Sequence, residues 1–377
     1  MTWLTGSLGY IIPFLVVLTV LVFFHELGHY LVARRNGVRV EVFSIGFGPE
    51  LFGWDDRAGT RWKVSAIPLG GYVKMFGDAD PASMPGEHVA HMTAAEQAVS
   101  FHHKRLGQRA AVVAAGPIAN FLLAIVLLTV IIAVRGQQIS PAEVGTVLPN
   151  SAAEAAGLEQ GDVITAIDGQ PIDRFEAIQR VIELNTGTPI EIVVKRAGQD
   201  VTLHATPRVV NEQDRFGFTH QVTRLGIGRK GVEYVKRSPA TAVWYAAEET
   251  WNITTGTLKA VWQMLIGLRS TNELSGPFGI IQLSGAVAQD GVLPLLGFAA
   301  VLSINLGLIN LFPIPVLDGG HLLFYAAEAV RGRPLGQRAQ EYGFRLGLAL
   351  VVTLMVVATW NDLMRWNIFK LIRGLAT

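Results

Sequence analysis

Long runs of apolar residues dominate the pattern of the chain. Residues 1–24 contain no charged side chain, and the apolar pattern resumes after residues 25–29 as far as residue 33. Residues 110–134 and 291–317 are also uncharged, and residues 346–361 form a shorter apolar run. A helix that crosses the hydrocarbon core of a bilayer needs about 20 apolar residues. The pattern therefore predicts four membrane-spanning helices, the last ending at the interfacial residues Trp360 and Trp366.

The composition agrees with a membrane protein. Half of the 377 residues are hydrophobic and only 16% are charged, which is more apolar than an ordinary soluble domain. The net charge of +1 gives no general attraction to nucleic acid. The chain has no cysteine, so disulfides, thiolate nucleophiles and cysteine metal sites are excluded. The first run lacks a basic start and a small-residue cleavage site, so we interpret it as a span and not as a signal peptide.

Basic residues near the span ends predict the orientation of the chain. One side is expected to carry Arg34, Arg35, Arg39, Lys104, Arg105, Arg109, Arg331, Arg333, Arg338 and Arg345. The other side is expected to carry Arg135, Arg269, Arg365, Lys370 and Arg373. Cytoplasmic loops carry the excess of Lys and Arg. The larger group therefore predicts two cytoplasmic loops, with both termini and the long segment between the second and third spans outside.

The first loop has the composition of β-structure. It contains the runs FSIGFGPELF and KVSAIPLGGYVKMFGD, which are apolar strands broken by Gly and Pro. One interpretation is a small hairpin packed on the spans. The other is a hairpin that dips into the membrane, which is possible only where protein or a water-filled cavity shields its backbone.

The external segment begins with the pattern of a soluble α+β domain. The helix-then-glycine step AAEAAGLEQGD and the strand VITAIDGQPI resemble the PDZ domain in its bacterial arrangement. PDZ domains bind extended chains at a sheet edge, although a domain that only restricts access is the alternative. A helical stretch follows, in which Trp244, Trp251 and Trp262 return to nearly the same helix face. That stripe suits either a helix at the membrane surface or a packed core helix.

The run FFHELGHYLV, residues 23–32, places three ionisable groups in the first span. His25 and His29 share one helix face, with Glu26 beside them. This is the zinc-peptidase spacing, in which two imidazoles bind the metal and the glutamate takes a proton from water. The motif alone is a weak indication, and a hydrogen-bonded polar cluster is the alternative. Ionisable groups at membrane depth are costly and usually functional, which favours the metal site.

A catalytic zinc site needs a third protein ligand, and the third span offers two candidates. A single helix over residues 293–331 would be roughly 58 Å long at 1.5 Å per residue, nearly twice the ~30 Å hydrocarbon core. Pro313 and Pro315 are therefore expected to break this span before Asp318. Asp318 then lies near the cytoplasmic end, at a depth similar to that of His29. His321 is the competing ligand, and we favour Asp318 because of its position at the break.

Four motifs together resemble the site-2 protease family of intramembrane zinc metalloproteases, in particular its bacterial regulator-of-sigma-E proteases. They are HELGH, PLGGYVKMFGD, GPIANF and NLFPIPVLDGG, and they extend over most of the chain. The resemblance implies one zinc ion on His25, His29 and Asp318, with Glu26 as the general base. It implies that Asn310 and Asn305 contact the substrate backbone. The hairpin residues that it implies as a receiver of substrate, as an added strand, are Pro68, Leu69, Gly70, Gly71, Tyr72 and Val73.

The implied fold is a polytopic α-helical membrane protein with four spans, a membrane-reentrant hairpin and one inserted PDZ domain. The expected segments are 1–33, first span; 34–107, cytoplasmic with the hairpin; 108–136, second span; 137–207, PDZ; 208–290, linker with an interfacial helix; 291–331, broken third span; and 332–377, loop, fourth span and tail. Better-known relatives carry two tandem PDZ domains, whereas this segment has room for one plus a linker.

The resemblance also implies partners and a location. The substrates would be single-span proteins, such as anti-sigma factors or remnant signal peptides, cut within the bilayer during regulated intramembrane proteolysis, with no role for nucleic acid. The enzyme would lie in the bacterial inner membrane with its PDZ domain in the periplasm. Two other classes remain open from the residues alone. A membrane-anchored PDZ adaptor explains the external domain but not the ionisable groups, and a metal transporter predicts further ligands along the other spans.

Overall fold

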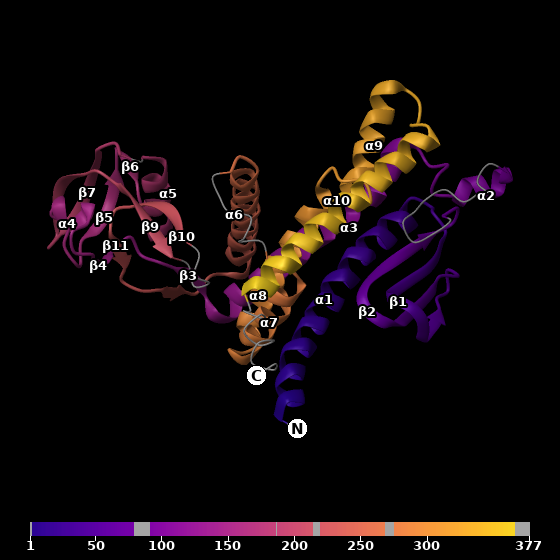
Figure 1. Ribbon diagram of the computed structural model, residues 1–377, viewed down its shortest axis with the longest axis horizontal. Helices are drawn as coiled ribbons and strands as arrows, with labels where there is room; N and C mark the ends of the chain where they lie inside the picture. Colours follow the sequence, from indigo (N-terminus) through magenta and orange to yellow (C-terminus); the bar gives the residue numbers. More distant parts are fainter. Residues whose placement is uncertain (1, 79–90, 186, 214–218, 268–274, 366–377) are drawn as a thin grey trace, which may run out of the picture. The chain divides into compact units, whose positions relative to one another are not determined.

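The computed structural model describes residues 2–78, 91–185, 187–213, 219–267 and 275–365. The chain forms two compact units (Figure 1). One consists of Met1–Val130 and Val243–Thr377, and the other of Ile131–Ala242. The first unit contains the apolar helices and the hairpin, and the second is a small domain of strands and two short helices.

Four helices of the described part are long and apolar enough to cross a membrane, in agreement with the four predicted spans. They are α1 (Thr2–Arg35), α3 (Leu106–Arg135), α8 (Val292–Leu311) and α10 (Gln337–Arg365). Helix α10 begins earlier than the predicted span. Only 6% of its most apolar stretch is buried within the protein, which leaves its apolar side chains for lipid contact.

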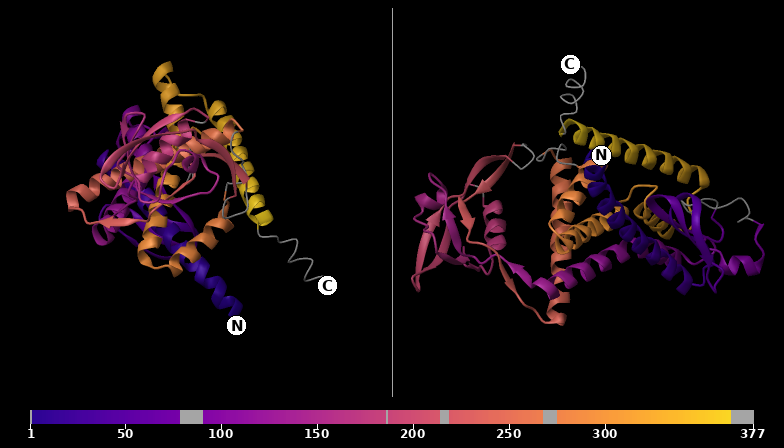
Figure 2. Two further views of the ribbon diagram at one scale, coloured as in Figure 1. Left: turned by 90° about the vertical axis from the view of Figure 1, so that its left-hand side faces the viewer. Right: turned by 90° about the horizontal axis from the view of Figure 1, so that it is seen from below.

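Helices α7 (Pro277–Gln289) and α8 pack directly against α1. Figures 1 and 2 show these two helices in orange beside α1 in indigo. A Cβ added to Gly285 of α7 would lie 2.1 Å from the Tyr10 ring of α1, so only glycine permits this approach. Residues of α7 were expected in an extracytoplasmic linker, whereas this helix belongs to the helical unit. Farther along α1, Leu21 shares one buried cluster with Leu123 of α3 and Ala299 of α8.

The third apolar stretch is divided, because α8 ends at Leu311 and α9 (Asp318–Arg331) begins after a turn. Pro313 and Pro315 lie in that turn, where neither can continue a helix without losing a hydrogen bond. Val316 adopts φ +96°, an unusual value for a β-branched residue. The apolar stretch is thus interrupted by a tight turn just before Asp318.

The first loop forms a curled sheet and a short helix, α2 (Ala94–Val99). Strand β1 (Val40–Asp55) pairs antiparallel with β2 (Arg61–Met75). The register is unusual, because Phe43 of β1 lies opposite both Trp62 and Val73 of β2. The two strands therefore fold back into four segments, ordered 50–55, 61–65, 42–45 and 71–75. Positive φ values at Gly46 and Gly70 permit the bends.

This sheet is anchored on the helices by its apolar side chains. Phe43 is fully buried in a cluster with Ala33 of α1, Val73 of β2 and Val112 of α3. The segment 71–75 is the edge that lies against α1, since a Cβ on Gly71 would come within 3.0 Å of Val22. A β-hairpin was predicted here. Its entry into the membrane is a separate expectation that remains a prediction.

The second unit is built around a four-stranded sheet in the order β6-β5-β7-β8. Its elements are β3 (Gln137–Ile139), β4 (Val144–Val147), α4 (Ala152–Ala155), β5 (Val163–Ile167), β6 (Gln170–Pro171), α5 (Phe175–Leu184), β7 (Ile190–Arg196), β8 (Gln199–Ala205), β9 (Arg208–Gln213), β10 (Thr219–Arg224), β11 (Ile227–Arg229) and β12 (Glu233–Val235). Isoleucines of β5, α5 and β7 fill its buried core. The alternation of strands with two short helices agrees with the predicted α+β domain.

This unit extends farther along the chain than the predicted domain 137–207. Strand β11 pairs with β4, and β12 pairs with β3. Leu225, 2% exposed, belongs to the buried core of the unit. Residues 208–235 therefore contribute strands to the domain, although they were assigned to a linker. They are short and rich in glycine and charge, so their pattern alone does not distinguish strands from a loop.

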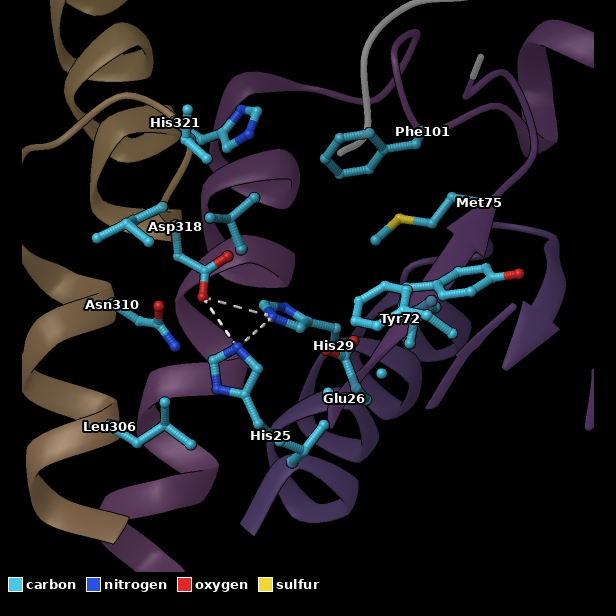
Figure 3. A pocket seen from close by; sticks show the side chains of 18 residues that line it. His25, Glu26, His29, Tyr72, Met75, Phe101, Leu306, Asn310, Asp318 and His321 are labelled. Carbon is cyan, nitrogen blue, oxygen red and sulfur yellow. Dashed lines mark hydrogen bonds and ion pairs between the residues drawn. The ribbon is translucent and has the colours of Figure 1, made fainter. Parts of the chain in front are cut away.

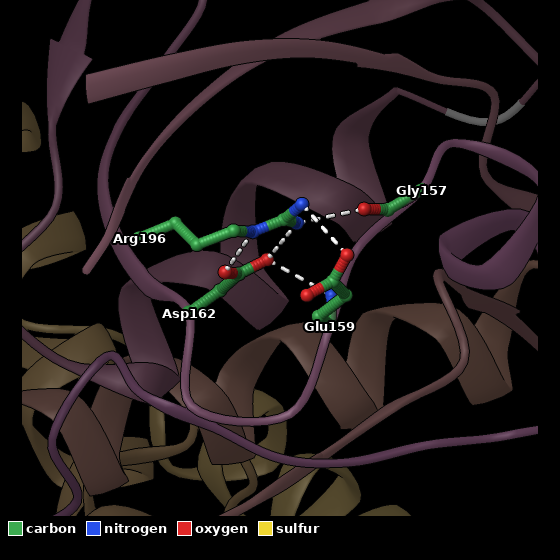
Figure 4. Close-up of polar contacts among 4 residues, drawn as sticks. All are labelled: Gly157, Glu159, Asp162 and Arg196. Carbon is green, nitrogen blue, oxygen red and sulfur yellow. Dashed lines mark hydrogen bonds and ion pairs between the residues drawn. The ribbon is translucent and has the colours of Figure 1, made fainter. Parts of the chain in front are cut away.

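An ion-pair cluster closes the turn before β5 (Figure 4). Arg196 of β7 donates hydrogen bonds to Asp162 from Nε at 2.8 Å and from Nη2 at 2.7 Å. The same guanidinium contacts Glu159 at 2.9 Å and the Gly157 carbonyl oxygen at 2.7 Å. Asp162 is almost fully buried. Burial alone would raise its pKa, but the hydrogen bonds from Arg196 and from the Glu159 N–H outweigh it, so the pKa of Asp162 is lowered.

Helix α6 (Pro239–Leu265) carries the tryptophan stripe. Trp244, Trp251 and Trp262 are 72%, 68% and 62% exposed, so they are not part of a packed core in the described part of the chain. The opposite side of the helix packs through Ile253 against a cluster of α3 and α8. The exposed stripe favours a helix whose aromatic face meets lipid.

Candidate functional site

Helix α1 presents His25 and His29 on one face. Their Nε2 atoms lie 3.2 Å apart, and both side chains are almost fully buried. The i, i+4 spacing places one imidazole above the other on a helix. Glu26, one residue farther round, lines the same cavity (Figure 3). The three groups singled out by their spacing therefore meet at one site.

Asp318 joins the two histidines from the start of α9. Its Oδ2 lies 3.2 Å from His25 Nε2 and 3.6 Å from His29 Nε2. The glycines that follow make this position possible, because a Cβ on Gly319 would lie 2.2 Å from the Phe312 carbonyl oxygen. A Cβ on Gly320 would similarly approach the backbone at Ile314. The DGG sequence thus lets α9 begin against the end of α8 and direct Asp318 at α1.

The donor set fits a zinc ion. A tetrahedral zinc with ligand bonds of about 2.0–2.1 Å separates its ligand atoms by about 3.3 Å, close to the three distances above. Asp318 Oδ2 is buried and has no hydrogen-bond partner among the described residues. Two imidazole nitrogens and one carboxylate oxygen converge there, which is the chemistry of a cation site. Three protein ligands leave a fourth position open, as catalytic zinc requires.

His321, the competing ligand, lies apart from this group. It lines the same cavity of 410 Å³, but its ring packs edge-on against Phe344 at 5.4 Å between centroids. The ligand group in the described part of the chain consists of His25, His29 and Asp318. Figure 3 shows the His321 ring turned away from these three side chains.

The remaining histidines lie elsewhere. His102 Nε2 contacts Asp78 at 2.9 Å and His103 Nδ1 contacts Ser100 at 3.2 Å. His88 falls outside the described residues. The transporter hypothesis predicts further ligands along the other spans. The described residues provide no second group of three or more ligand side chains.

Helix α3 supplies three contacts to the imidazoles that the sequence pattern did not reveal. The Val112 carbonyl oxygen lies 2.9 Å from His29 Nδ1, and Asn120 Nδ2 lies 3.0 Å from His25 Nδ1. Between them, a Cβ on Gly116 would lie 2.3 Å from His29 Nε2. In the sequence, the motif GPIANF contributes only to the family resemblance. An amide inside an uncharged run was its one chemical signal, since a polar group in a span needs a partner.

The residues expected to bind substrate are only partly at the cavity. Gly70, Gly71, Tyr72, Val73 and Asn310 line it. Pro68 is exposed and does not line it, and the Leu69 side chain is outside the described part. Asn305 is directed elsewhere, because its Oδ1 accepts a hydrogen bond of 3.4 Å from Thr257 of α6. The edge segment 71–75 therefore borders the site, whereas Asn305 contacts a neighbouring helix.

A family model identifies the chain. The model of peptidase family M50, the site-2 protease family, matches residues 13–354. The chain belongs to peptidase family M50. A protein of Agrobacterium fabrum named "putative zinc metalloprotease" is 47% identical over 95% of this chain and 97% of its own length. Metalloprotease MmpA of Caulobacter vibrioides is 40% identical over 99% of this chain and 100% of its own length.

Membership confirms the predicted likeness to site-2 proteases, the enzyme class and the zinc cofactor. This M50 peptidase is a zinc metalloendopeptidase and a multi-pass membrane protein. The finer likeness to regulator-of-sigma-E proteases stays a prediction. Among solved structures, the PDZ domain of the SdrC-like protein of Listeria monocytogenes aligns with 24% of this chain and 87% of its own. The identity is 21% and the TM-score 0.20, too slight to support an argument.

Proposed function

We propose that this M50 peptidase cleaves transmembrane segments of single-span proteins, with His25, His29 and Asp318 holding the zinc and Glu26 moving the proton. One observation carries the proposal. Three ligand atoms, two from the apolar helix α1 and one from the start of α9, converge within 3.2–3.6 Å in a buried cavity. Burying ionisable groups in such surroundings costs free energy, so residues of this kind usually serve a function.

The zinc ligands and Glu26 have separate roles in peptide hydrolysis. Bound zinc supplies the Lewis acidity that activates water and polarises the scissile carbonyl. Glu26 lines the same cavity, where it takes a proton from the attacking water and later gives it to the leaving amine. Atoms balance in this scheme, since water adds across the peptide bond to give a carboxylate and an amine. The apolar helices around the cavity restrict water to the site of reaction.

The edge segment 71–75 is the proposed receiver of substrate. A transmembrane helix hides its amides in its own hydrogen bonds, so it must be unwound before it is cut. A strand edge offers replacement hydrogen bonds to an extended chain. Gly71 lies against Glu26, since a Cβ there would come within 3.2 Å of the Glu26 Cγ. A chain paired with this edge would therefore pass beside the general base, with Asn310 across the cavity as a further backbone contact.

The proposed setting is the bacterial inner membrane, with the Ile131–Ala242 unit in the periplasm. The basic residues flanking the spans support this orientation. The unit would act as a filter that rejects proteins whose external domains are intact. Its proposed substrates are single-span proteins already trimmed outside, of the anti-sigma-factor or remnant-signal-peptide kind.

The test is cleavage of a model single-span substrate by purified protein in detergent or liposomes. Glu26→Gln is expected to lower the rate by at least about 100-fold and to keep bound zinc, because Glu26 is not a ligand. Asp318→Ala is expected to lose both zinc and cleavage. Full cleavage by Glu26→Gln would disprove the mechanism. Zinc-free protein of normal fold that still bound peptides would instead favour the adaptor hypothesis.

A further inference from the structure

We propose that the Asn120 side chain orients His25 for metal binding, by accepting a hydrogen bond from the His25 Nδ1–H through its amide oxygen. Asn120 is a positioning residue in this scheme, because it acts through His25 and touches neither substrate nor the attacking water. The role rests on the proposed function, since it concerns a histidine that would hold the zinc.

The starting observation is an unpaired oxygen. Asn120 lies on α3 and is completely buried. Its amide nitrogen lies 3.0 Å from His25 Nδ1, while its Oδ1 is buried with no hydrogen-bond partner in the described part of the chain. The nitrogen and oxygen of an amide have nearly the same shape, so their placement must be assigned from the hydrogen bonds around them.

The tautomer of His25 decides that assignment. An amide nitrogen can only donate, so an Nδ2 that faces His25 needs a lone pair on Nδ1 and a hydrogen on Nε2. That hydrogen would block the atom that lies 3.2 Å from both His29 Nε2 and Asp318 Oδ2. A metal-binding Nε2 requires the hydrogen on Nδ1, facing an acceptor. Rotating the amide by 180° turns Oδ1 toward His25 Nδ1 as the acceptor. The amide nitrogen then takes the former place of Oδ1, where no donor among the described residues opposes it.

His29 shows the same arrangement without ambiguity. Its Nδ1 lies 2.9 Å from the Val112 carbonyl oxygen, which can only accept. The hydrogen of His29 is therefore on Nδ1 and its Nε2 is free to bind metal. Val112, Gly116 and Asn120 are spaced by four residues, so they share one face of α3. One helix face thus orients both histidines and, at Gly116, leaves room for their rings.

Helix α8 holds Asn120 in place. The Ser303 hydroxyl donates a hydrogen bond of 2.8 Å to the backbone carbonyl oxygen of Asn120, and both residues are fully buried. A Cβ on Gly307 would lie 3.2 Å from the Asn120 Cβ, so α8 approaches α3 closely at this point. The backbone position of Asn120 is therefore fixed by its contacts with α8.

The experiment measures zinc affinity of the purified full-length protein by competition with a chelator. Asn120→Leu removes donor and acceptor at similar volume, and it is expected to weaken binding by about 10- to 100-fold. Asn120→Asp keeps the shape and can only accept when ionised, so its affinity is expected to be within about threefold of the wild type or tighter. Thr129→Val is the control on the same helix. Its hydroxyl bonds only to the Ile125 carbonyl in the described part, and its affinity should not change.

Each outcome separates the two proposals. A wild-type protein without zinc affinity would overturn the proposed metal site itself. Wild-type affinity in Asn120→Leu would leave that site intact and overturn the role of Asn120. Equal weakening in Asn120→Asp and Asn120→Leu would show that the amide donates, which also overturns the inference. If Asn120→Leu does not fold, comparison of Asn120→Asp with the wild type still decides between acceptor and donor.

Discussion

At the scale of single residues, Gly116 leaves the space that the two histidine rings occupy. A Cβ at this position would lie 2.3 Å from His29 Nε2 and 2.8 Å from His25 Cε1, so both rings would have to move. Gly116→Ala is therefore expected to weaken zinc binding at least about tenfold and to lower cleavage accordingly. Chelator competition and a cleavage assay measure the two effects.

The matched control is Gly107→Ala on the same helix. A Cβ there meets nothing within 4 Å, so this variant should bind zinc normally and gain up to about 1 kcal/mol of helix stability. Unchanged zinc affinity in Gly116→Ala would show that the imidazoles do not need the space that glycine leaves.

These contacts mark the limit of sequence reasoning at this scale. His25, Glu26 and His29 could be predicted because their chemistry repeats at helical spacing within ten residues. Asp318 needed the proline break and a resemblance to known proteases. Asn120 and Gly116 act across a helix interface, and nothing in their own neighbourhood indicates which atoms they meet. The contact of Asn305 with Thr257 belongs to the same kind, since Thr257 lies on a helix whose position the sequence does not give; its expected contact with substrate stays a prediction.

At the scale of elements, the Asp162–Arg196 contact joins the turn before β5 to β7. Asp162 is buried and its pKa is lowered, so the contact stabilises the domain above the unfolded pKa of about 3.9. That stabilisation is lost as the pH falls through the folded pKa. Arg196→Met is expected to destabilise the domain by about 1–3 kcal/mol at pH 7, and the difference from the wild type should shrink below about pH 4.

Hydrogen–deuterium exchange of the β5 and β7 amides in the full-length protein measures this difference. Arg180→Met, an exposed position on α5, is the control and should leave exchange unchanged. A wild-type-to-variant difference that stays constant down to pH 3 would show that Asp162 does not titrate against Arg196.

The same scale shows why helices were easier to predict than strands. The spans follow from long uncharged runs, and the break at Pro313 and Pro315 follows from helix length. The four segments of the β1–β2 sheet do not, because β1 pairs with two parts of β2. The described strands after residue 207 are only three to six residues long, and the pairing of β11 with β4 and of β12 with β3 is decided by contacts distant in sequence.

At the scale of the whole molecule, the paired ends of the Ile131–Ala242 unit allow it to be removed cleanly. Ile139 of β3 lies opposite Glu233 of β12, so deletion of residues 140–232 can be closed by a short glycine linker. If the unit filters substrates, the shortened enzyme should cleave single-span proteins with intact external domains at least about tenfold faster than the full chain. Both enzymes should cleave trimmed substrates equally, because the cavity lies wholly in the helical unit.

Equal zinc content is the control for an intact site. A shortened enzyme that still rejected untrimmed substrates would show that the helical unit makes the selection. A shortened enzyme that no longer cleaved trimmed substrates would show that the Ile131–Ala242 unit binds substrate.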